Sequence, residues 1–238
     1  CTHTRADVNT GVLDRLHVSG LTAEDVDLFA DVFTGFPHAW GASGDRPRCI
    51  WEDVTPRTIL RHLEGTAPMG VYPMVYDPTH RAGGPSAFHE QHRIYQESHR
   101  RDLWMCRWGC VDLDAHKPGR RGQGTEAEIL DAGRTIQAVL DGAGLGSWIE
   151  RTRSGGIHVW LLVDDWVRCD DMRRALGHAV DVAGVTIDSI YPRVDHALGP
   201  PGNFVRLPYF GASKPGRLTM LDDQDLPLSL HDFLDEVR

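Results

Sequence analysis

The order of apolar and polar positions along the chain predicts a mixture of helices and strands. Helical patterning predicts four helices, the first three behind a threonine cap, over 22–33, 55–65, 125–140 and 170–183. Short apolar or alternating runs predict six strands, over 71–76, 103–113, 147–151, 157–163, 204–207 and 218–221. The strands come in pairs and do not alternate strictly with helices, which favours an α+β fold over a doubly wound sheet.

Glycine, proline and charged residues mark the connections between these elements. Loops are predicted at GASGDRP (41–47), over 77–101, and at the basic, glycine-rich KPGRRGQG (117–124), with a turn at RSGG (153–156). No internal repeat is visible. We therefore predict two lobes, a mostly helical N-terminal lobe over 1–100 and a second lobe over 101–238. The second lobe is expected to hold a mixed or antiparallel sheet flanked by helices.

The composition is that of an ordinary globular protein. The chain has 238 residues, of which 41% are hydrophobic and 25% charged, and no apolar run approaches the ~18 residues of a membrane span. The polar first ten residues predict no secretory signal. The chain begins with Cys1, not with Met, so we expect a piece of a longer protein. Five cysteines without a CxxC pair predict reduced thiols in a cytoplasmic protein.

The charge balance narrows the choice of partners. A net charge of -9 argues mildly against a general nucleic-acid coat, but a local basic groove is compatible with it. The basic residues are nearly all arginine, and lysine occurs only as Lys117 and Lys214. Two lysines retained in so arginine-rich a chain are candidates for a specific role.

The sharpest candidate for chemistry is the pair Asp112 and Asp114, in VDLD at the end of a predicted strand. Alternate side chains of a strand project to one face, so the two carboxylates project together. Like charges on one face repel unless a cation lies between them, and hard oxygen ligands suit Mg²⁺ or Mn²⁺. A solvated strand end has the same pattern, and the pair alone favours that simpler interpretation.

A second candidate is the glycine-rich turn that leads into a strand, RSGGIHVW over 153–160. Glycine lets a backbone approach a phosphate closely, and Ser154 offers a hydroxyl. His158 enters a strand of otherwise apolar residues, where a lone histidine is more often a hydrogen-bonded core residue. Its position directly after the turn makes phosphate contact an equally good interpretation.

A third candidate is Asp195 in YPRVDHALGPPGN, followed by Arg206 and Lys214 in NFVRLPYFGASKPGR. Proline and glycine hold Asp195 in a loop. Arg206 alternates with apolar neighbours, where an unpaired charge is costly, so it is expected to meet a carboxylate or a substrate phosphate. For an isolated arginine, a structural salt bridge is the better interpretation.

In this order the pieces resemble the archaeo-eukaryotic primase superfamily, and within it the primase-polymerase branch. The family pattern is an hhDhD strand, a helix, a small-x-His strand after Ser or Gly, a third acid, and an RLPG-x-x-N-x-K-like segment. Here stand GCVDLDAH, SGGIHVW, Asp195 and RLPYFGASK, with HLEGTAPMGVYP upstream similar to the segment before the first acids. The resemblance covers residues 60–221. Tyr209 replaces the family's glycine, Ser213 stands nearest to its asparagine, and Asp188 is a nearby alternative to Asp195.

The resemblance implies a DNA primase-polymerase whose second lobe is catalytic. Such an enzyme makes or extends primers on single-stranded DNA from nucleoside triphosphates, with two Mg²⁺ or Mn²⁺ ions. The implied metal ligands are Asp112, Asp114 and Asp195. The implied triphosphate contacts are Ser154, Gly156, His158, Arg206 and Lys214. Contact with template or nucleotide phosphates is a further candidate role, with a solvated loop as an equally good interpretation, for Lys117, Arg120 and Arg121. A helicase is a common companion in this family.

Three other functions are compatible with the same residues. A two-metal phosphodiesterase or nuclease uses the same acids. A replication-origin or single-strand DNA-binding protein needs no metal, and the intact acid pair argues against it. A gap-filling repair polymerase stays within the family.

Overall fold

A computed structural model describes residues 20–42, 47–76, 104–115, 124–193, 203–212 and 218–238. Its helices are α2 (Ala23–Val32), α3 (Pro56–Leu63), α5 (Glu126–Gly142), α6 (Cys169–Ala183) and α7 (Leu230–Glu236). Its strands are β1 (Trp40–Ala42), β2 (Arg48–Ile50), β3 (Met69–Val71), β4 (Val75–Tyr76), β5 (Trp104–Leu113), β6 (Ser147–Arg151), β7 (Ile157–Arg168), β8 (Ser189–Tyr191), β9 (Val205–Arg206) and β10 (Thr219–Leu221). No helix in these ranges is long and apolar enough to cross a membrane.

Local sequence signals explain where three of the helices begin. Thr22, Thr55 and Thr125 each accept a hydrogen bond from the backbone N–H three residues later, and each belongs to a capping box. These bonds satisfy N–H groups that have no partner inside the helix. The predicted starts of α2, α3 and α5 are therefore confirmed.

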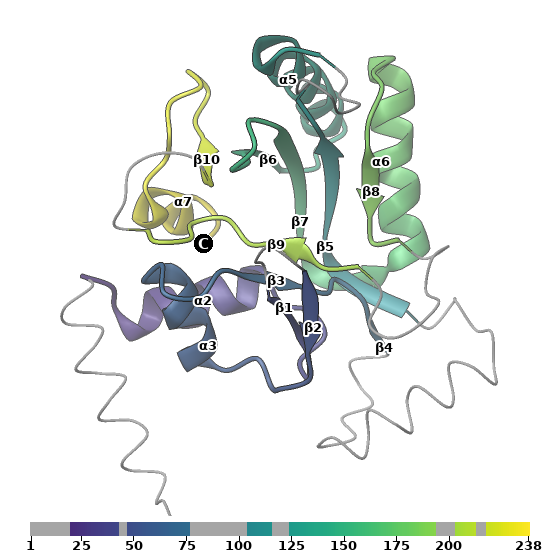
Figure 1. Ribbon diagram of the computed structural model, residues 1–238. Coiled ribbons are helices and arrows are strands. Elements are labelled where there is room, and N and C mark those ends of the chain that lie inside the picture. Colours follow the sequence, from purple (N-terminus) through teal and green to yellow (C-terminus); the bar gives the residue numbers. More distant parts are fainter. Residues whose placement is uncertain (1–19, 43–46, 77–103, 116–123, 194–202, 213–217) are drawn as a thin grey trace, which may run out of the picture.

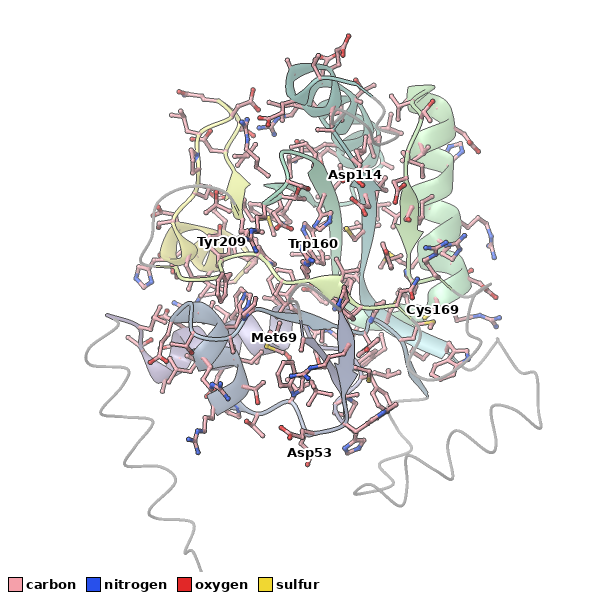
Figure 2. All side chains as sticks on the ribbon, viewed as in Figure 1. Asp53, Met69, Asp114, Trp160, Cys169 and Tyr209 are labelled. Carbon is pink, nitrogen blue, oxygen red and sulfur yellow. The ribbon has the colours of Figure 1, made fainter. Side chains whose placement is uncertain are left out.

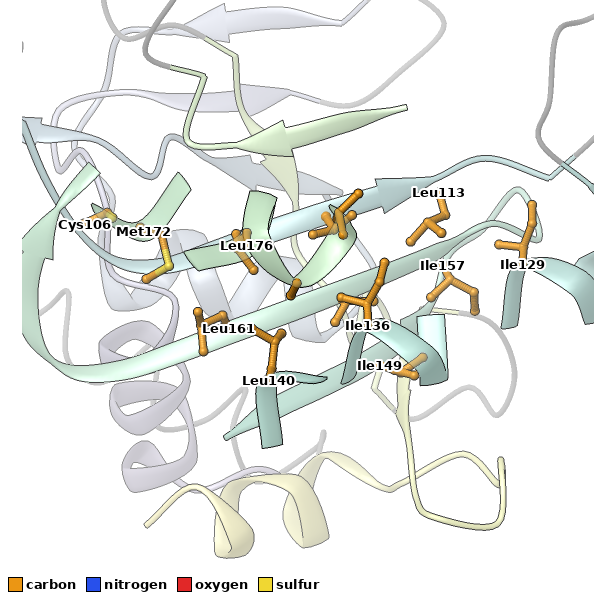
Figure 3. Close-up of a cluster of buried hydrophobic side chains, with 14 of the residues drawn as sticks. Cys106, Leu113, Ile129, Ile136, Leu140, Ile149, Ile157, Leu161, Met172 and Leu176 are labelled. Carbon is orange, nitrogen blue, oxygen red and sulfur yellow. The ribbon is translucent and has the colours of Figure 1, made fainter. Parts of the chain in front are cut away.

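A large antiparallel sheet forms the centre of the molecule. Its strand order is β10-β6-β7-β5-β4, and β8 pairs with the end of β5. Figure 1 shows α5 and α6 together on one side of this sheet, with α2, α3 and α7 on the other. A buried apolar cluster fills the first interface and includes Ile136, Leu161 and Leu176, as Figure 3 shows. This combination of helices and antiparallel sheets confirms the predicted α+β class.

A second, small sheet brings distant segments of the chain together. Its order is β2-β1-β3-β9, so β9 pairs with β3 across the sequence. The predicted strand over 71–76 is in fact two strands in different sheets, because Pro73 has no N–H to continue a ladder. The predicted loop over 41–47 begins inside β1. Residues 77–103 lie outside the described ranges, so the lobe boundary at residue 100 stays a prediction.

Strand β5 changes face at a bulge. The sequence pattern predicts that Trp104, Cys106, Trp108 and Cys110 share one face with the aspartates. The register with β7 shifts between Cys106 and Trp108. Trp108 and Cys110 consequently pack toward α2 and α7, whereas Trp104 and Cys106 pack in the cluster under α5 and α6. The prediction was wrong for Trp104 and Cys106, because an extra residue in a strand inverts the alternation before it.

The end of α3 fixes the segment that follows β9. His62 is buried, its Nε2–H donates to the carbonyl oxygen of Pro208 at 2.7 Å, and its Nδ1 accepts from the N–H of Met69 at 3.2 Å. Burial lowers the pKa of His62 to about 4 despite the bond to Pro208, so the ring is neutral. Tyr209 follows with a φ of 62°, in the region that favours glycine, which is the residue of the family pattern.

Candidate functional site

A pocket of about 570 Å³ opens where the ends of β5 and β7 meet the small sheet. Its acidic side chains are Asp112 of β5 and Asp114, which directly follows that strand and is labelled in Figure 2. Its basic side chains are Arg48 of β2, Arg153 of the turn before β7, and Arg206 of β9. A pocket with carboxylates and guanidinium groups together suits a ligand that brings both anionic groups and a cation.

The register of the large sheet determines which side chains meet the acids. Asp112 lies opposite His158 of β7 on one side and opposite Ser189 of β8 on the other. The Nε2 atom of His158 lies 3.5 Å from Oδ1 of Asp112. On the far side of His158, Nδ1–H donates to Oε2 of Glu150 at 2.8 Å. The histidine therefore lies between two carboxylates from adjacent strands.

Burial and neighbouring charges shift the pKa values of Asp112 and His158. Burial raises the pKa of Asp112, His158 lowers it, and the carboxylates of Asp114, Asp188 and Glu150 raise it further. Burial lowers the pKa of His158, but Glu150 and Asp112 together outweigh it, so the pKa lies above its ordinary value. Both His158 and Asp112 therefore hold a proton more strongly than the free side chains do.

Asp188 belongs to the surroundings of the acid pair. Its backbone N–H donates to the carbonyl oxygen of Asp112 at 2.9 Å, and its carboxylate accepts from the hydroxyl of Ser189 at 3.1 Å. The side chain is exposed and raises the pKa of Asp112 through its charge. The structure therefore provides a third acid close to Asp112 within the described residues.

The predicted RSGG turn is a tight hairpin between β6 and β7. The N–H of Thr152 donates to the oxygen of Gly156 at 2.9 Å, and Gly155 has a φ of 86°. The hydroxyls of Thr152 and Ser154 lie 3.2 Å apart. A Cβ on Gly156 would lie 2.5 Å from the backbone oxygen of Leu113. Glycine is therefore required there for the close approach of two backbones.

On the opposite wall of the pocket, the ring of Phe204 packs against a pair of glycines. Gly41 of β1 lies opposite Gly70 of β3, and the ring of Phe204 covers both. Phe204 also meets the edge of Tyr72, with ring centroids 5.7 Å apart. Both rings line the pocket beside Arg206. This arrangement gives the pocket a flat apolar surface next to its cationic one.

Replacing Gly70 by alanine is expected to destabilise the fold by about 1–3 kcal/mol, the usual cost of overpacking. The new Cβ would lie 2.3 Å from the Phe204 ring and 2.6 Å from the oxygen of Val205. Gly142→Ala is the matched control, because no atom lies within 4 Å of its added Cβ, and we expect unchanged or slightly higher stability. Chemical denaturation of both variants measures the difference. Equal stabilities would contradict the packing described for Phe204.

No protein-family model and no curated protein matches this chain. Among solved structures, the chain is similar to the polymerase domain of Ligase D from Mycobacterium tuberculosis, solved in complex with DNA. The identity is 13%, the TM-score is 0.44, and the alignment covers 92% of this chain and 88% of that one. At these values the similarity carries no argument about function.

The structure brings together residues from all three sequence candidates. The pocket is lined by Asp112, Asp114, Ser154, His158 and Arg206. Gly156 packs against β5, as described above. Arg206 is exposed, so burial does not force it to find an anion, and its predicted contact with a carboxylate or a substrate phosphate stays a prediction. Five predicted site residues lie outside the described residues, and their roles stay predictions: Lys117, Arg120, Arg121, Asp195 and Lys214.

Several side chains of the pocket region were not singled out from the sequence. Arg48, Tyr72 and Phe204 enter through the small sheet, and Glu150 lies beneath His158. The available signal for Glu150 was an acid inside a predicted strand, SWIER, directly after Trp148 and Ile149. Within the described ranges, no group of three or more His, Cys, Asp or Glu side chains is arranged to hold a metal ion.

Proposed function

We propose that this protein is a template-dependent nucleotidyltransferase, a DNA primase-polymerase that makes or extends primers on single-stranded DNA. The observation that carries the proposal is a pocket lined by residues of three motifs of the sequence resemblance, GCVDLDAH, SGGIHVW and RLPYFGASK. The acids come from the end of β5 and the residue that follows it, the serine and histidine from the turn and start of β7, and the arginine from β9. These residues lie far apart in the sequence, and the fold brings them together at one pocket in the way that a shared catalytic site requires.

The charges of the pocket fit a nucleoside triphosphate. Two aspartates and three arginines line it, so a ligand must meet both signs of charge. Arginine offers a planar fork of N–H donors that matches phosphate oxygens. Arg48 and Arg206 are exposed and have no ion pair among the described residues. The flat surface of Phe204 lies beside Arg206 and suits a sugar or base.

Asp112 and Asp114 line the pocket and Asp188 follows beside Asp112, and carboxylate oxygens are the donors that a hard divalent ion takes, although the described side chains do not converge on one ion position. All three offer carboxylate oxygens, and burial, together with the neighbouring carboxylates, raises the pKa of Asp112. Asp195 remains an alternative third ligand. A bound Mg²⁺ or Mn²⁺ would polarise phosphate oxygens and lower the pKa of an attacking hydroxyl. The protein's own contribution is to hold these oxygens on adjacent backbone segments.

The remaining residues orient the substrate and stabilise charge. His158 presents Nε2 toward Asp112 at the edge of the pocket, where a cationic ring stabilises negative charge on a phosphate. Ser154 offers a hydroxyl from a tight turn. Arg206 of β9 holds the triphosphate from the wall that the small sheet forms.

The direct test is incorporation of labelled nucleotides by the purified chain with Mn²⁺. Primed and unprimed single-stranded DNA are supplied in parallel, and the products are resolved by length. Extended or newly made strands support the proposal. Shortened DNA without incorporation would instead identify a nuclease, and retention of DNA with no chemistry in any metal would identify a binding protein.

A further inference from the structure

Glu150 is a carboxylate in the interior of the large sheet. Its side chain is fully buried, with no exposed surface. Its Oε2 accepts hydrogen bonds from Nδ1 of His158 and from Nε1 of Trp160, both at 2.8 Å. Its Oε1 has no hydrogen-bond partner among the described residues. Burying a charged group is costly unless it is paired, so this position demands a specific partner.

The indole of Trp160 does not require a carboxylate. A comparable buried indole in this fold has a neutral acceptor: Nε1 of Trp108 donates a hydrogen bond to the backbone oxygen of Thr34 at 2.7 Å. The indole nitrogen of Trp40 has no partner at all within the described residues. An acid beneath Trp160 is therefore explained by its second partner, His158, and not by the indole alone.

The register places Glu150, His158 and Asp112 in one row. Glu150 of β6 lies opposite His158 of β7, and His158 lies opposite Asp112 of β5. The row leads from the core to the pocket. Because Nδ1 of His158 is bonded to Glu150, the remaining ring nitrogen, Nε2, is the one that faces Asp112.

The Trp160 contact makes Glu150 a rigid support. The indole packs against Trp108 and Phe33, with ring centroids 5.2 Å apart in both cases. It also meets the ring of His158 edge-on at 5.6 Å. The carboxylate is thus held by a fixed indole N–H while it holds the imidazole. Neither ring rotates without breaking a hydrogen bond inside the core.

We propose that Glu150 is a positioning residue that fixes the ring orientation of His158 by accepting from its Nδ1–H, so that Nε2 is presented to the ligand of the pocket. The identity of that ligand as a triphosphate rests on the proposed function. The positioning itself is a property of the row of three side chains. Glu150 acts only through His158 and does not reach the ligand.

The test compares Glu150→Met, which removes the acceptor at similar volume, with Glu150→Gln, which keeps an acceptor oxygen. Binding of a nucleoside triphosphate is measured by calorimetry, with inorganic triphosphate as a second probe. We expect Glu150→Met to weaken binding about ten-fold, since charge-assisted hydrogen bonds carry that much energy. Glu150→Gln is expected to retain most of the affinity. Trp160→Phe is the matched control, because it removes the other donor to the same oxygen.

A double-mutant cycle separates positioning from a merely structural role. In a His158→Ala background, Glu150→Met should cause no further loss of affinity, while in a Trp160→Phe background it should still cause its full loss. An undiminished effect without His158 would overturn the proposal. So would unchanged affinity of Glu150→Met accompanied only by a lower melting temperature.

A spectroscopic readout keeps this inference separate from the proposed function. In histidine-labelled protein, the nitrogen NMR signals of His158 report which ring nitrogen carries the proton. We expect the protonated Nδ1 signal in the wild type and its change in Glu150→Met, whether or not any nucleotide binds. An unchanged signal would overturn the positioning role. If the Met variant does not fold, Glu150→Asp takes its place, because its shorter side chain does not reach Nδ1.

Discussion

Asp112→Asn and Asp114→Asn are each expected to reduce nucleotide incorporation at least about a thousand-fold, which corresponds to the several kcal/mol that a metal ion supplies to charge stabilisation. Both side chains line the pocket and offer the oxygens that suit a divalent ion. The amide keeps the shape of the carboxylate but removes its charge. Steady-state incorporation on primed DNA measures the loss.

The same substitutions are expected to leave the fold intact. Because burial and neighbouring acids raise the pKa of Asp112 above its unfolded value, its ionised form destabilises the protein at neutral pH. Asp112→Asn should therefore melt at an equal or higher temperature. Asp164→Asn, an exposed change in β7, is the control and should retain full activity. Full incorporation by the Asp112 and Asp114 double variant would contradict the metal site.

Arg206→Ala is expected to weaken nucleoside triphosphate binding by about 10–150-fold, equivalent to the roughly 1.5–3 kcal/mol of a charged hydrogen bond. The guanidinium is exposed to the pocket and makes no ion pair with another described residue, so little stability should be lost. Arg206→Lys keeps the charge without the planar fork and should lie between wild type and alanine. Calorimetric titration with a non-hydrolysable nucleotide measures the affinities.

An exposed arginine outside the pocket controls for the loss of charge. Arg57 lies on α3 and is not among the residues that line the pocket, so Arg57→Ala should not change nucleotide affinity. If both alanine variants weakened binding equally, the effect would be general electrostatics. If Arg206→Ala bound normally and only melted earlier, Arg206 would have a structural role.

Helices and their caps were predictable because their signals are local. In a capping box, a threonine accepts a hydrogen bond from the backbone three residues later, and the side chain of that later residue accepts one from the threonine's backbone. This pattern lies within four residues of sequence, so it identifies the start of a helix. The prediction of one strand over 71–76 was wrong, because Pro73 separates two strands there. The predicted face of Trp104 and Cys106 was wrong, because no local feature of the sequence indicates the bulge in β5.

The candidate site was predictable where a single strand carries it. Asp112 and Asp114 face the pocket together because strand side chains alternate. The wall of Arg48, Tyr72 and Phe204 was not predictable, since it depends on β9 pairing with β3 from far along the chain. Glu150 was missed for the same reason, because its meaning comes from the register that aligns it with His158.

The most direct measurement is a structure of the protein with a non-hydrolysable nucleoside triphosphate and Mn²⁺. We expect the triphosphate to lie in the pocket, with metal-bound oxygens at Asp112 and Asp114 and a phosphate within hydrogen-bonding distance of Arg206. Nε2 of His158 should face that phosphate. A nucleotide bound elsewhere, or a pocket that stays empty at saturating nucleotide and Mn²⁺, would contradict the proposed function.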